Sequence, residues 1–370
     1  MTNLKEQMKM LALLVLALPM TFVACSDDDN PSDDPDAPGR METGVFVYNS
    51  GNQGSAIDGS LSFIDIQNGQ VTNDAFLSVN GRSLGSTVQD GVVLGENLYI
   101  AVSESNTVEV VNKNTLVSVA QILPTTEQGS SPRDIVTDGD YVYVSMFSGH
   151  VSRINPATNT IDKTVKVGPN PEEMAISGDY LYVVNSDGNN WQAGYANGKS
   201  VSKVSLSTFE EEKKIPVGLN PTKMVTDASG NLIVLCMGDY TAANPASLWK
   251  INSSDEAADM GIQATIMAVR GNSLYTINAP FGATEVSYIV YNTVTGAVEN
   301  PNFVSTPVDS PAGLAVHPES GNIYITSYTL VGGFASYNTP GYVNAYDPDG
   351  TLTGKYDVGV GAVYMSFLDE

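Results

Sequence analysis

The sequence has few of the residues from which catalytic and metal sites are built. Its 370 residues include two histidines and two cysteines, and no group of them has the spacing of metal ligands. It contains neither a phosphate-binding Gly-Lys-Ser/Thr loop nor a Gly-x-Ser-x-Gly nucleophile turn. Residues 187–189 and 347–350 carry oxygen ligands for Ca²⁺, but turn formation explains both segments. We therefore expect a protein that is not an enzyme and that uses no cofactor and no metal.

Basic residues are also scarce. The chain has 17 lysines and arginines against 41 aspartates and glutamates, a formal net charge of −24. Such acidity argues against binding to nucleic acid or to an anionic membrane surface, because both would repel the chain. It favours solubility and suits a positively charged partner.

The two cysteines have different surroundings. Cys25 ends an N-terminal apolar run, whereas Cys236 lies in the apolar stretch 232–237, which is typical of a buried strand. If Cys25 is modified, Cys236 has no partner, so we expect no disulfide. Because apolar burial raises the pKa of a thiol, Cys236 is predicted to be an unreactive core residue.

The N-terminus has the pattern of a lipoprotein signal peptide. Lys5 and Lys9 precede the apolar run 11–18, which is too short to span a bilayer. Ala24 and Cys25 resemble the end of a bacterial lipobox, although Phe22 stands where leucine is usual. We predict that residues 1–24 are a signal peptide and that acyl chains on Cys25 are the only attachment to the membrane.

An acidic tether is predicted over residues 25–43. Residues 26–38 are rich in Asp and Pro and lack the apolar side chains that a core needs, so we expect them to be disordered. This segment is compatible with a plain tether. Ser followed by several Asp directly after the lipidated Cys is also similar to the surface-export signal of Bacteroidetes lipoproteins, which predicts an outer-membrane, surface-exposed, lipid-anchored protein.

A repeat organises the rest of the chain. Val167-Gly-Pro-Asn-Pro171 recurs as Val217-Gly-Leu-Asn-Pro221, and related segments follow at intervals of 39 to 51 residues. Each segment opens an apolar run. A turn follows, often Gly-Asp or Gly-Asn, and then a second apolar strand. The seven aligned positions are Val88, Pro132, Pro171, Pro221, Ala264, Pro311 and Ala362.

Four strands per repeat, with the innermost most apolar and the outermost most charged, predict a seven-bladed β-propeller over residues 44–370. Residues 44–48 match a second strand that has no first strand before it, and residues 360–368 match a first strand with nothing after it. The C-terminal strand should therefore join the N-terminal blade and close the ring without free sheet edges.

The long insertions fall on one predicted face. The connections from the second to the third strand and from one blade to the next emerge on the same side, and they carry several aromatic rings. Exposed rings are unfavourable unless something covers them, so we predict a ligand-binding face. The candidate ligand-binding residues are Tyr48, Asn49, Arg133, Phe147, Glu172, Asn185, Trp191, Tyr195, Asp239, Tyr240, Phe281, Tyr328, Phe334 and Tyr337.

Two of these candidates have an alternative role. Arg133 and Glu172 each follow an aligned proline and should point toward the mouth of the central channel. They are placed either to anchor a ligand or to pair with each other across adjacent blades.

At the Val-Gly-x-Asn-Pro and Gly-Asp-x-Leu-Tyr-Val repeats, the chain resembles the YncE-like seven-bladed propellers. The lipobox with its acidic tail, together with segments 183–191, 217–221 and 236–240, resembles the BtuG family of Bacteroidetes surface lipoproteins. That resemblance implies capture of vitamin B12 (cobalamin, a corrinoid) as a ligand rather than a cofactor, and delivery to an outer-membrane TonB-dependent transporter. The alternatives are a glycan-binding or adhesion lipoprotein, or a protein-interaction subunit of a surface complex.

Overall fold

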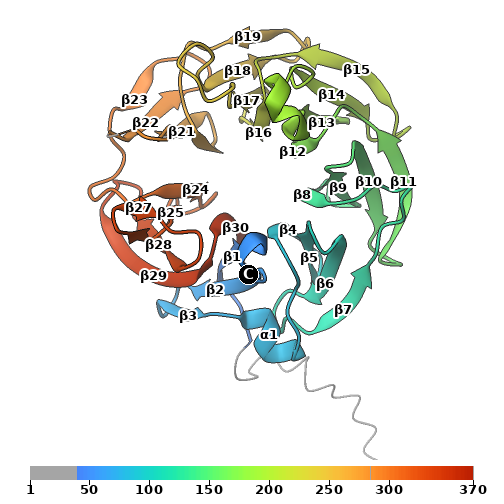
Figure 1. The fold of residues 1–370 in the computed structure, drawn as a ribbon, viewed down its shortest axis with the longest axis vertical. Coiled ribbons are helices and arrows are strands. Elements are labelled where there is room, and N and C mark those ends of the chain that lie inside the picture. Colours follow the sequence, from blue (N-terminus) through green and yellow to red (C-terminus); the bar gives the residue numbers. More distant parts are fainter. Residues whose placement is uncertain (1–39, 284, 370) are drawn as a thin grey trace, which may run out of the picture. The chain divides into compact units, whose positions relative to one another are not determined.

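The computed structural model describes residues 40–283 and 285–369. They form seven antiparallel four-stranded sheets arranged as blades around one axis (Figure 1), which confirms the predicted all-β, seven-bladed propeller. The predicted signal peptide, Cys25 and most of the tether lie outside the described residues and stay predictions. Within the described ranges, no helix has the length and apolar content needed to cross a membrane.

In blades 2 to 6 the four strands follow the chain from the axis to the rim. Blade 2 contains β4 (Val88–Leu94), β5 (Asn97–Val102), β6 (Thr107–Asn112) and β7 (Ser118–Ile122); blade 3 contains β8 (Pro132–Thr137), β9 (Val142–Met146), β10 (His150–Asn155) and β11 (Thr160–Lys166); blade 4 contains β12 (Pro171–Ser177), β13 (Tyr180–Asn185), β14 (Ser200–Ser205) and β15 (Glu211–Pro216); blade 5 contains β16 (Pro221–Thr226), β17 (Leu232–Cys236), β18 (Ser247–Ile251) and β19 (Ala257–Asp259); blade 6 contains β20 (Ile266–Arg270), β21 (Ser273–Asn278), β22 (Ser287–Asn292) and β23 (Val298–Asn300).

Blades 7 and 1 depart from this simple order. A small hairpin interrupts blade 7, and the first strand of blade 1 comes from the C-terminus. Blade 7 contains β24 (Pro311–Val316), β25 (Ile323–Ser327), β28 (Pro340–Tyr346) and β29 (Leu352–Val360), with the hairpin β26 (Leu330–Val331) and β27 (Phe334–Ala335); blade 1 contains β30 (Ala362–Leu368), β1 (Gly44–Asn49), β2 (Ser60–Asp65) and β3 (Gln70–Thr72); the helices are η1 (Gln53–Ser55), α1 (Ala75–Asn80) and η2 (Gly188–Ala193).

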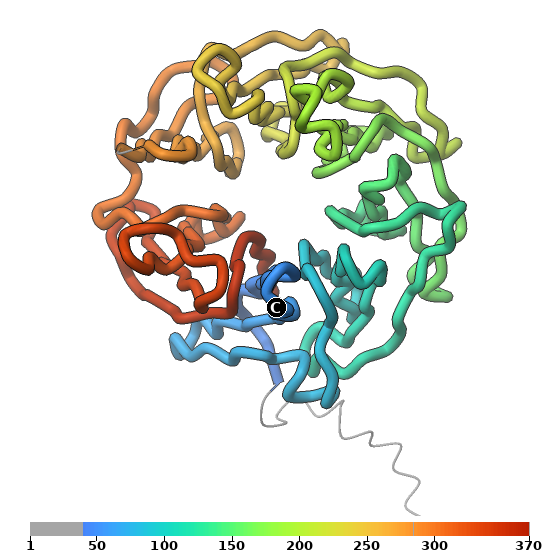
Figure 2. Tube along the Cα trace, in the orientation of Figure 1, coloured from blue at the N-terminus to red at the C-terminus, as the bar shows by residue number. Residues whose placement is uncertain are grey.

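Blade 1 closes the ring as predicted. Strand β1 pairs antiparallel with β2 on one side and with β30 on the other, from Gly44 opposite Leu368 onward. Figure 2 shows the two ends of the propeller side by side in this blade. The hydroxyls of Tyr48 and Ser366 add a hydrogen bond of 2.7 Å across the closure. Strand β30 thus covers the inner edge of β1, which would otherwise be unpaired.

The aligned positions predict where the innermost strands begin. Six of the seven strands start at the aligned residue, and the seventh, β20, starts at Ile266 instead of Ala264. Blade 6 lacks the proline of its neighbours, and there the Thr265 hydroxyl accepts the Ala279 N–H at 2.9 Å. The apolar run predicted for this blade, residues 267–269, lies within β20.

The hydrophobic core lies between neighbouring blades. Along β1, side chains alternate between the two sides of the sheet: Phe46 and Tyr48 pack against blade 2, whereas Val45 and Val47 pack against blade 7. All four are fully buried. Burying one such apolar side chain stabilises the fold by about 1.5–3 kcal/mol, so the interfaces between blades hold the ring together.

Packing begins before the predicted start of the propeller. Met41 is buried against blade 2, and its N–H donates to the Asn114 carbonyl at 2.7 Å. The Arg40 side chain reaches the same asparagine. Residues 40 and 41 thus contact blade 2 without joining a sheet, and the alignment of strands cannot detect such contacts.

An Asn-Pro pair turns the chain into the first strand of blade 4 and of blade 5. Asn170 and Asn220 have left-handed backbones with φ of 48° and 55°, a conformation that Asn tolerates better than most residues. Two residues earlier, the Gly168 N–H donates to Asn185 Oδ1 at 3.0 Å. A Cβ on Gly168 would lie 2.3 Å from Asn185 Cγ, so only glycine fits this approach.

Replacing Gly168 therefore tests the scaffold. We expect Gly168→Ala to lower the free energy of unfolding by about 1–3 kcal/mol, because the added methyl group collides with Asn185. Gly54→Ala is the matched control, since its Cβ would meet nothing closer than 3.4 Å. Chemical denaturation of both variants measures the difference, and equal stabilities would contradict this account of the repeat.

Candidate ligand-binding face

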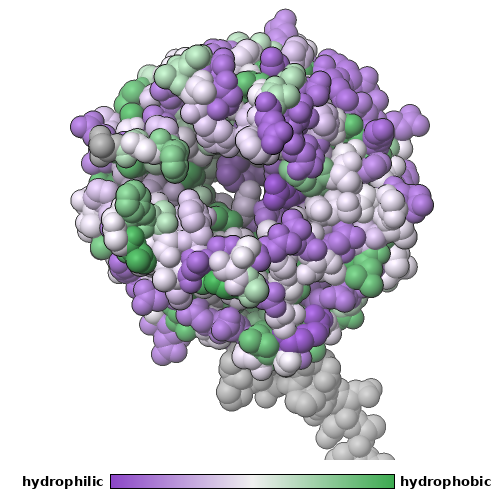
Figure 3. All heavy atoms as spheres, viewed as in Figure 1, coloured by the Kyte–Doolittle hydropathy of each residue, from purple (hydrophilic) through white to green (hydrophobic). Residues whose placement is uncertain are grey.

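The long loops and the connections between blades share one face, the loop face. In blade 4 the backbone N–H groups of Ser186 and Asp187 donate to the carbonyls of Asn170 and Pro169, both at 3.1 Å. Equivalent bonds in blades 2, 3, 5 and 7 join the residue after the second strand to the residue before the first. These bonds fix each loop to its own blade, and Figure 3 shows that the molecule is hollowed at the middle of the ring.

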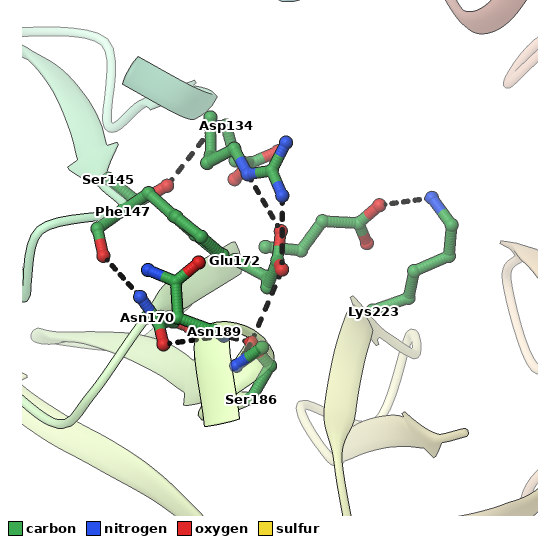
Figure 4. Close-up of polar contacts among 11 residues, drawn as sticks. Asp134, Ser145, Phe147, Asn170, Glu172, Ser186, Asn189 and Lys223 are labelled. Carbon is green, nitrogen blue, oxygen red and sulfur yellow. Dashed lines mark hydrogen bonds and ion pairs between the residues drawn. The ribbon is translucent and has the colours of Figure 1, made fainter. Parts of the chain in front are cut away.

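Arg133 and Glu172 form an ion pair at the mouth of the channel, and Figure 4 shows Glu172 with the polar groups around it. The guanidinium Nη2 lies 3.4 Å from Glu172 Oε1, and Nε lies 3.2 Å from Oε2. The guanidinium also stacks 4.2 Å from the centroid of the Phe147 ring. The alternative of pairing across blades 3 and 4 is therefore correct, and the exposed fractions of 26% and 18% leave both side chains partly accessible.

This ion pair presents a hydrogen-bond donor beside an acceptor. Burial raises the pKa of Glu172, and Arg133 and the Ser186 hydroxyl, which donates to Oε1 at 3.2 Å, partly offset that rise. The Nε of Arg133 is buried and has no hydrogen bond of good geometry. A ligand group that both donates and accepts, such as a primary amide or a hydroxyl, complements this arrangement.

Hydrogen bonds order the blade 4 insertion, residues 186–198. The Asn170 side chain donates to the Phe147 carbonyl at 2.9 Å and accepts the Asn189 N–H at 3.0 Å. The buried Asp187 carboxylate accepts from the side chain of Asn190 and the backbone of Asn197. The segment 187–189 is thus a hydrogen-bonded turn, and its carboxylate is already used within the loop.

Aromatic rings stand beside the mouth. Trp191 and Tyr240 are 63% and 60% exposed, and the rings of Tyr195 and Tyr240 meet edge to face at 6.2 Å. Burial, then the neighbouring Tyr195 and Glu172, raise the pKa of Tyr240, and a hydrogen bond with Asn220 partly offsets that rise. Asp239 accepts from Thr241 and Asn244 and thereby braces its own loop.

A second group of aromatics stands over blades 6 and 7. Phe281 is 98% exposed and Phe334, in the β26–β27 hairpin, is 80% exposed. Tyr328 and Tyr337 meet edge to face at 4.9 Å, and the Tyr337 carbonyl accepts from the side chain of Asn52 in blade 1. Green spheres gather on this side of the ring in Figure 3, whereas purple spheres dominate over blade 4. The predicted aromatics therefore form two groups rather than one.

Three predicted site residues are placed in the scaffold instead. Tyr48, Asn49 and Asn185 are fully buried, so their side chains do not face a ligand. Asn49 and Asn185 occupy equivalent positions in blades 1 and 4, and each donates to two serines on the neighbouring strand. The sequence placed them at the base of long loops, but the last residue of a second strand points into the blade.

Sequence reasoning missed a layer of charge inside the channel, one residue deeper than Arg133 and Glu172. Lys223 contacts the Glu173 carboxylate, and its ammonium lies 4.2 Å from the centroid of the Tyr364 ring on the closing strand. Below it, mostly apolar side chains of β16, β20, β24 and β30 enclose about 260 Å³. The sequence contained a signal for this layer, because the second residue after four of the aligned positions is charged: Asp90, Asp134, Glu173 and Lys223.

Acidic members of this layer bind the next blade. Each carboxylate accepts a backbone N–H from the first strand of the following blade, so it couples two sheets that share no ladder. Burial raises the pKa of Asp90 to about 7, and burial and the Asp90 charge hold the pKa of Asp134 well above its usual range. The bonds are Ile135 to Asp90 at 3.4 Å, Met174 to Asp134 at 2.8 Å and Met224 to Glu173 at 3.0 Å.

The histidines and the free cysteine have structural positions. His150 begins β10, and His317 Nδ1 accepts the backbone N–H groups of Glu319 and Ser320, both at 3.3 Å. Burial raises the pKa of the Cys236 thiol to about 12. In the part of the chain that the structure describes, no group of three or more His, Cys, Asp or Glu residues is arranged to hold a metal.

The acid pair predicts how stability depends on pH. The folded-state pKa of Asp90 exceeds its unfolded value of 3.8, so the folded protein binds more protons between about pH 4 and pH 7. The free energy of unfolding should therefore fall as the pH rises through this window, by roughly 2–4 kcal/mol.

Asp90→Asn should flatten this fall and make the protein more stable than wild type at pH 7 to 8. Asp140→Asn, in an exposed turn, serves as the control and should follow the wild-type curve. Denaturant titrations at a series of pH values measure the effect. An Asp90→Asn curve parallel to wild type would rule out proton uptake at this carboxylate.

Comparisons with known proteins identify the family but no activity. No curated protein matches the chain. Among solved structures, a functionally unknown protein from Desulfotomaculum acetoxidans DSM 771 aligns with a TM-score of 0.60 and 12% identity, covering 89% of this chain and 99% of its own. Hydrazine synthase of Kuenenia stuttgartiensis aligns with a TM-score of 0.58 and 18% identity, covering 74% and 87%. These likenesses concern the fold alone. The model of the domain of unknown function DUF5074 matches residues 43–364, and the chain therefore belongs to the DUF5074 family.

Proposed function

We propose that this protein is a surface lipoprotein without catalytic activity that binds cobalamin or a related corrinoid on its loop face. The observation that carries the proposal is the combination of Trp191, Tyr195 and Tyr240 with the Arg133–Glu172 pair beside the channel mouth. The resemblance of segments 183–191 and 236–240 to the BtuG family supports it.

The chemistry of a corrinoid suits this arrangement. Its macrocycle is wide, rigid and apolar, and primary amides surround its rim. Aromatic rings cover apolar surface, while a donor beside an acceptor satisfies an amide group. Arg133 and Glu172 offer these two functions a few ångströms apart, and the asparagines of the blade 4 insertion add further amide partners.

Rigidity supports tight binding. Backbone N–H groups of the insertion donate to the side chains of Asn170, Ser186 and Asp187, all of which are buried. A preformed site loses less conformational entropy on binding than a flexible one, so a larger part of the contact energy appears as affinity.

Cys25 and the acidic tether support a lipid anchor on the outer membrane with the propeller exposed at the cell surface. The partner that we infer is a TonB-dependent transporter, which receives the ligand. The exposed apolar loops over blades 6 and 7 suit such a protein contact, because residues 328–341 contain no charged residue and Phe281 and Phe334 are exposed.

The exposed loops over blades 6 and 7 also favour a second function. A protein-interaction or adhesion propeller would use Phe281 and Phe334 directly and would need no small ligand at the mouth.

Glycan binding is the other alternative. It shares the aromatic and amide chemistry of the mouth, since sugars stack on rings and exchange hydrogen bonds with amides.

Calorimetric titration of residues 40–370 with cyanocobalamin tests the proposal. We expect binding at micromolar concentration or tighter. Trp191→Ala should weaken it by about tenfold or more, because an indole that covers the macrocycle contributes on the order of 1.5–3 kcal/mol. Phe281→Ala is the control. It removes an exposed ring in blade 6, whereas Arg133 and Glu172 belong to blades 3 and 4, and it should leave the affinity unchanged.

The outcomes separate the functions. No binding of cyanocobalamin at micromolar concentration contradicts the corrinoid proposal. Binding of oligosaccharides in its place, with loss in Trp191→Ala, assigns the mouth to glycans. Binding that depends on Phe281 but not on Trp191 moves the ligand to blades 6 and 7.

A further inference from the structure

One residue below the mouth, the wall of the channel is charged on one half and uncharged on the other. The second residue after the aligned position carries a charge in blades 2 to 5. In blades 6, 7 and 1 the same position is occupied by Ile266, Gly313 and Tyr364. The channel is therefore amphipathic across its width, with its apolar half formed by the last two blades and the closing strand.

The cavity of about 260 Å³ lies on this apolar half, between the inner strands of blades 5, 6, 7 and 1. Strands β16, β24 and β30 face the central axis in Figure 1. Leu314, Met365 and Phe367 line the cavity and are only partly buried. Apolar surface is unfavourable in contact with water, so these side chains gain free energy when an apolar group covers them.

The size of the cavity limits what it can hold. An apolar cavity of about 150 Å³ is enough to bind benzene, so this one has room for an aromatic ring with a short substituent. Gly313 adds to the space, because it contributes no side chain at a position where the other blades have larger residues. The occupant is therefore a small molecule rather than a polymer or a protein segment.

Lys223 and Glu173 form the polar end of the cavity. Their side chains are 23% and 13% exposed and contact each other, and Glu173 Oε2 also accepts the Met224 N–H at 3.0 Å. An ammonium group has three donors and a carboxylate has about four acceptor positions, so both groups keep capacity for a further hydrogen bond. Because their charges offset each other, a neutral group that donates and accepts complements them better than an ion.

We propose that this cavity, the channel pocket, binds a small neutral molecule with an apolar body and one hydroxyl or amide group. The apolar body lies against Leu314, Met365 and Phe367. The hydroxyl or amide donates to Glu173 and accepts from Lys223. The hollow at the middle of the ring (Figure 3) gives such a molecule access.

The channel pocket is distinct from the site proposed for the corrinoid. Arg133 and Glu172 belong to blades 3 and 4 and lie at the mouth, whereas the pocket lies one layer deeper and is lined mainly by blades 5, 6, 7 and 1. The proposal for the pocket therefore does not depend on the identity of the ligand on the loop face.

Fluorine NMR titrations of residues 40–370 with four small probes test the proposal. We expect 4-fluorophenol to bind with a dissociation constant of about 0.1–1 mM, a range that suits a ligand of so few atoms. Fluorobenzene, which lacks the hydroxyl, should bind about threefold or more weakly. The cation 4-fluorobenzylamine and the anion 4-fluorobenzoate should also bind more weakly than 4-fluorophenol, because burial of an unpaired charge is unfavourable.

Filling the pocket tests its location. Ala315 lines the cavity and is partly exposed, so Ala315→Leu should occupy the space and weaken the binding of 4-fluorophenol by about tenfold or more. Ala258→Leu, on the exposed outer strand of blade 5, is the matched control and should leave the affinity unchanged. Thermal unfolding verifies that both variants are folded.

Lys223→Met tests the polar end. It removes the donor but keeps the length of the side chain, so we expect the affinity for 4-fluorophenol to fall to that for fluorobenzene. The affinity for fluorobenzene itself should stay the same, whereas general damage to the pocket would weaken both. Glu173→Gln, which preserves the shape of the side chain, is the second variant and should also reduce the preference for 4-fluorophenol.

Several results would overturn the proposal. They are binding of 4-fluorophenol no tighter than that of fluorobenzene, tightest binding of the amine or the benzoate, and binding that Ala315→Leu leaves unchanged. Absence of binding of all four probes at millimolar concentration would show that the channel holds only water. Cyanocobalamin titrated against Ala315→Leu reports the mouth separately, so failure of that binding in both the variant and the wild type contradicts the corrinoid proposal and leaves the channel pocket intact.

Discussion

The structure depends on closing the ring with strands from opposite ends of the chain. Strand β1 can bury Phe46 and Tyr48 against blade 2 and Val45 and Val47 against blade 7 only when β30 completes its sheet. Each blade buries its apolar side chains against its two neighbours. The first and last blades can therefore both be fully buried only when the ring is complete. Closure therefore converts seven weakly connected sheets into one cooperative unit.

Charge inside the channel strengthens this coupling where the sheets share no ladder. Asp134 and Glu173 each accept a backbone N–H from the following blade, and Lys223 reaches Tyr364 on the closing strand. These groups lie directly beneath Arg133 and Glu172. The polar mouth thus rests on buried, mutually fixed side chains, which keeps its donor and acceptor in place without a ligand.

Part of the candidate site could be read from the sequence. The long loops, the exposed Trp191 and Tyr240, and the position of Arg133 and Glu172 at the mouth followed from counting strands. Tyr48, Asn49 and Asn185 were misassigned because a polar or aromatic residue at a strand end has the same sequence signature whether it points outward or inward. Their burial depends on the twist of the blade and on the serines opposite, which the pattern along one strand does not contain.

The sequence by itself determined the number of blades, the start of six inner strands and the place of ring closure. These features depend on local chemistry, since Asn before Pro, glycine at tight turns and alternating apolar residues act within a few positions of the chain. Only the tertiary structure decided that Arg133 pairs with Glu172, that Lys223 reaches Tyr364 and that the exposed aromatics form two groups. The Arg133–Glu172, Lys223–Tyr364 and Tyr195–Tyr240 contacts join residues 39 or more positions apart on different blades, and their partners are set by the rotation of one blade against the next.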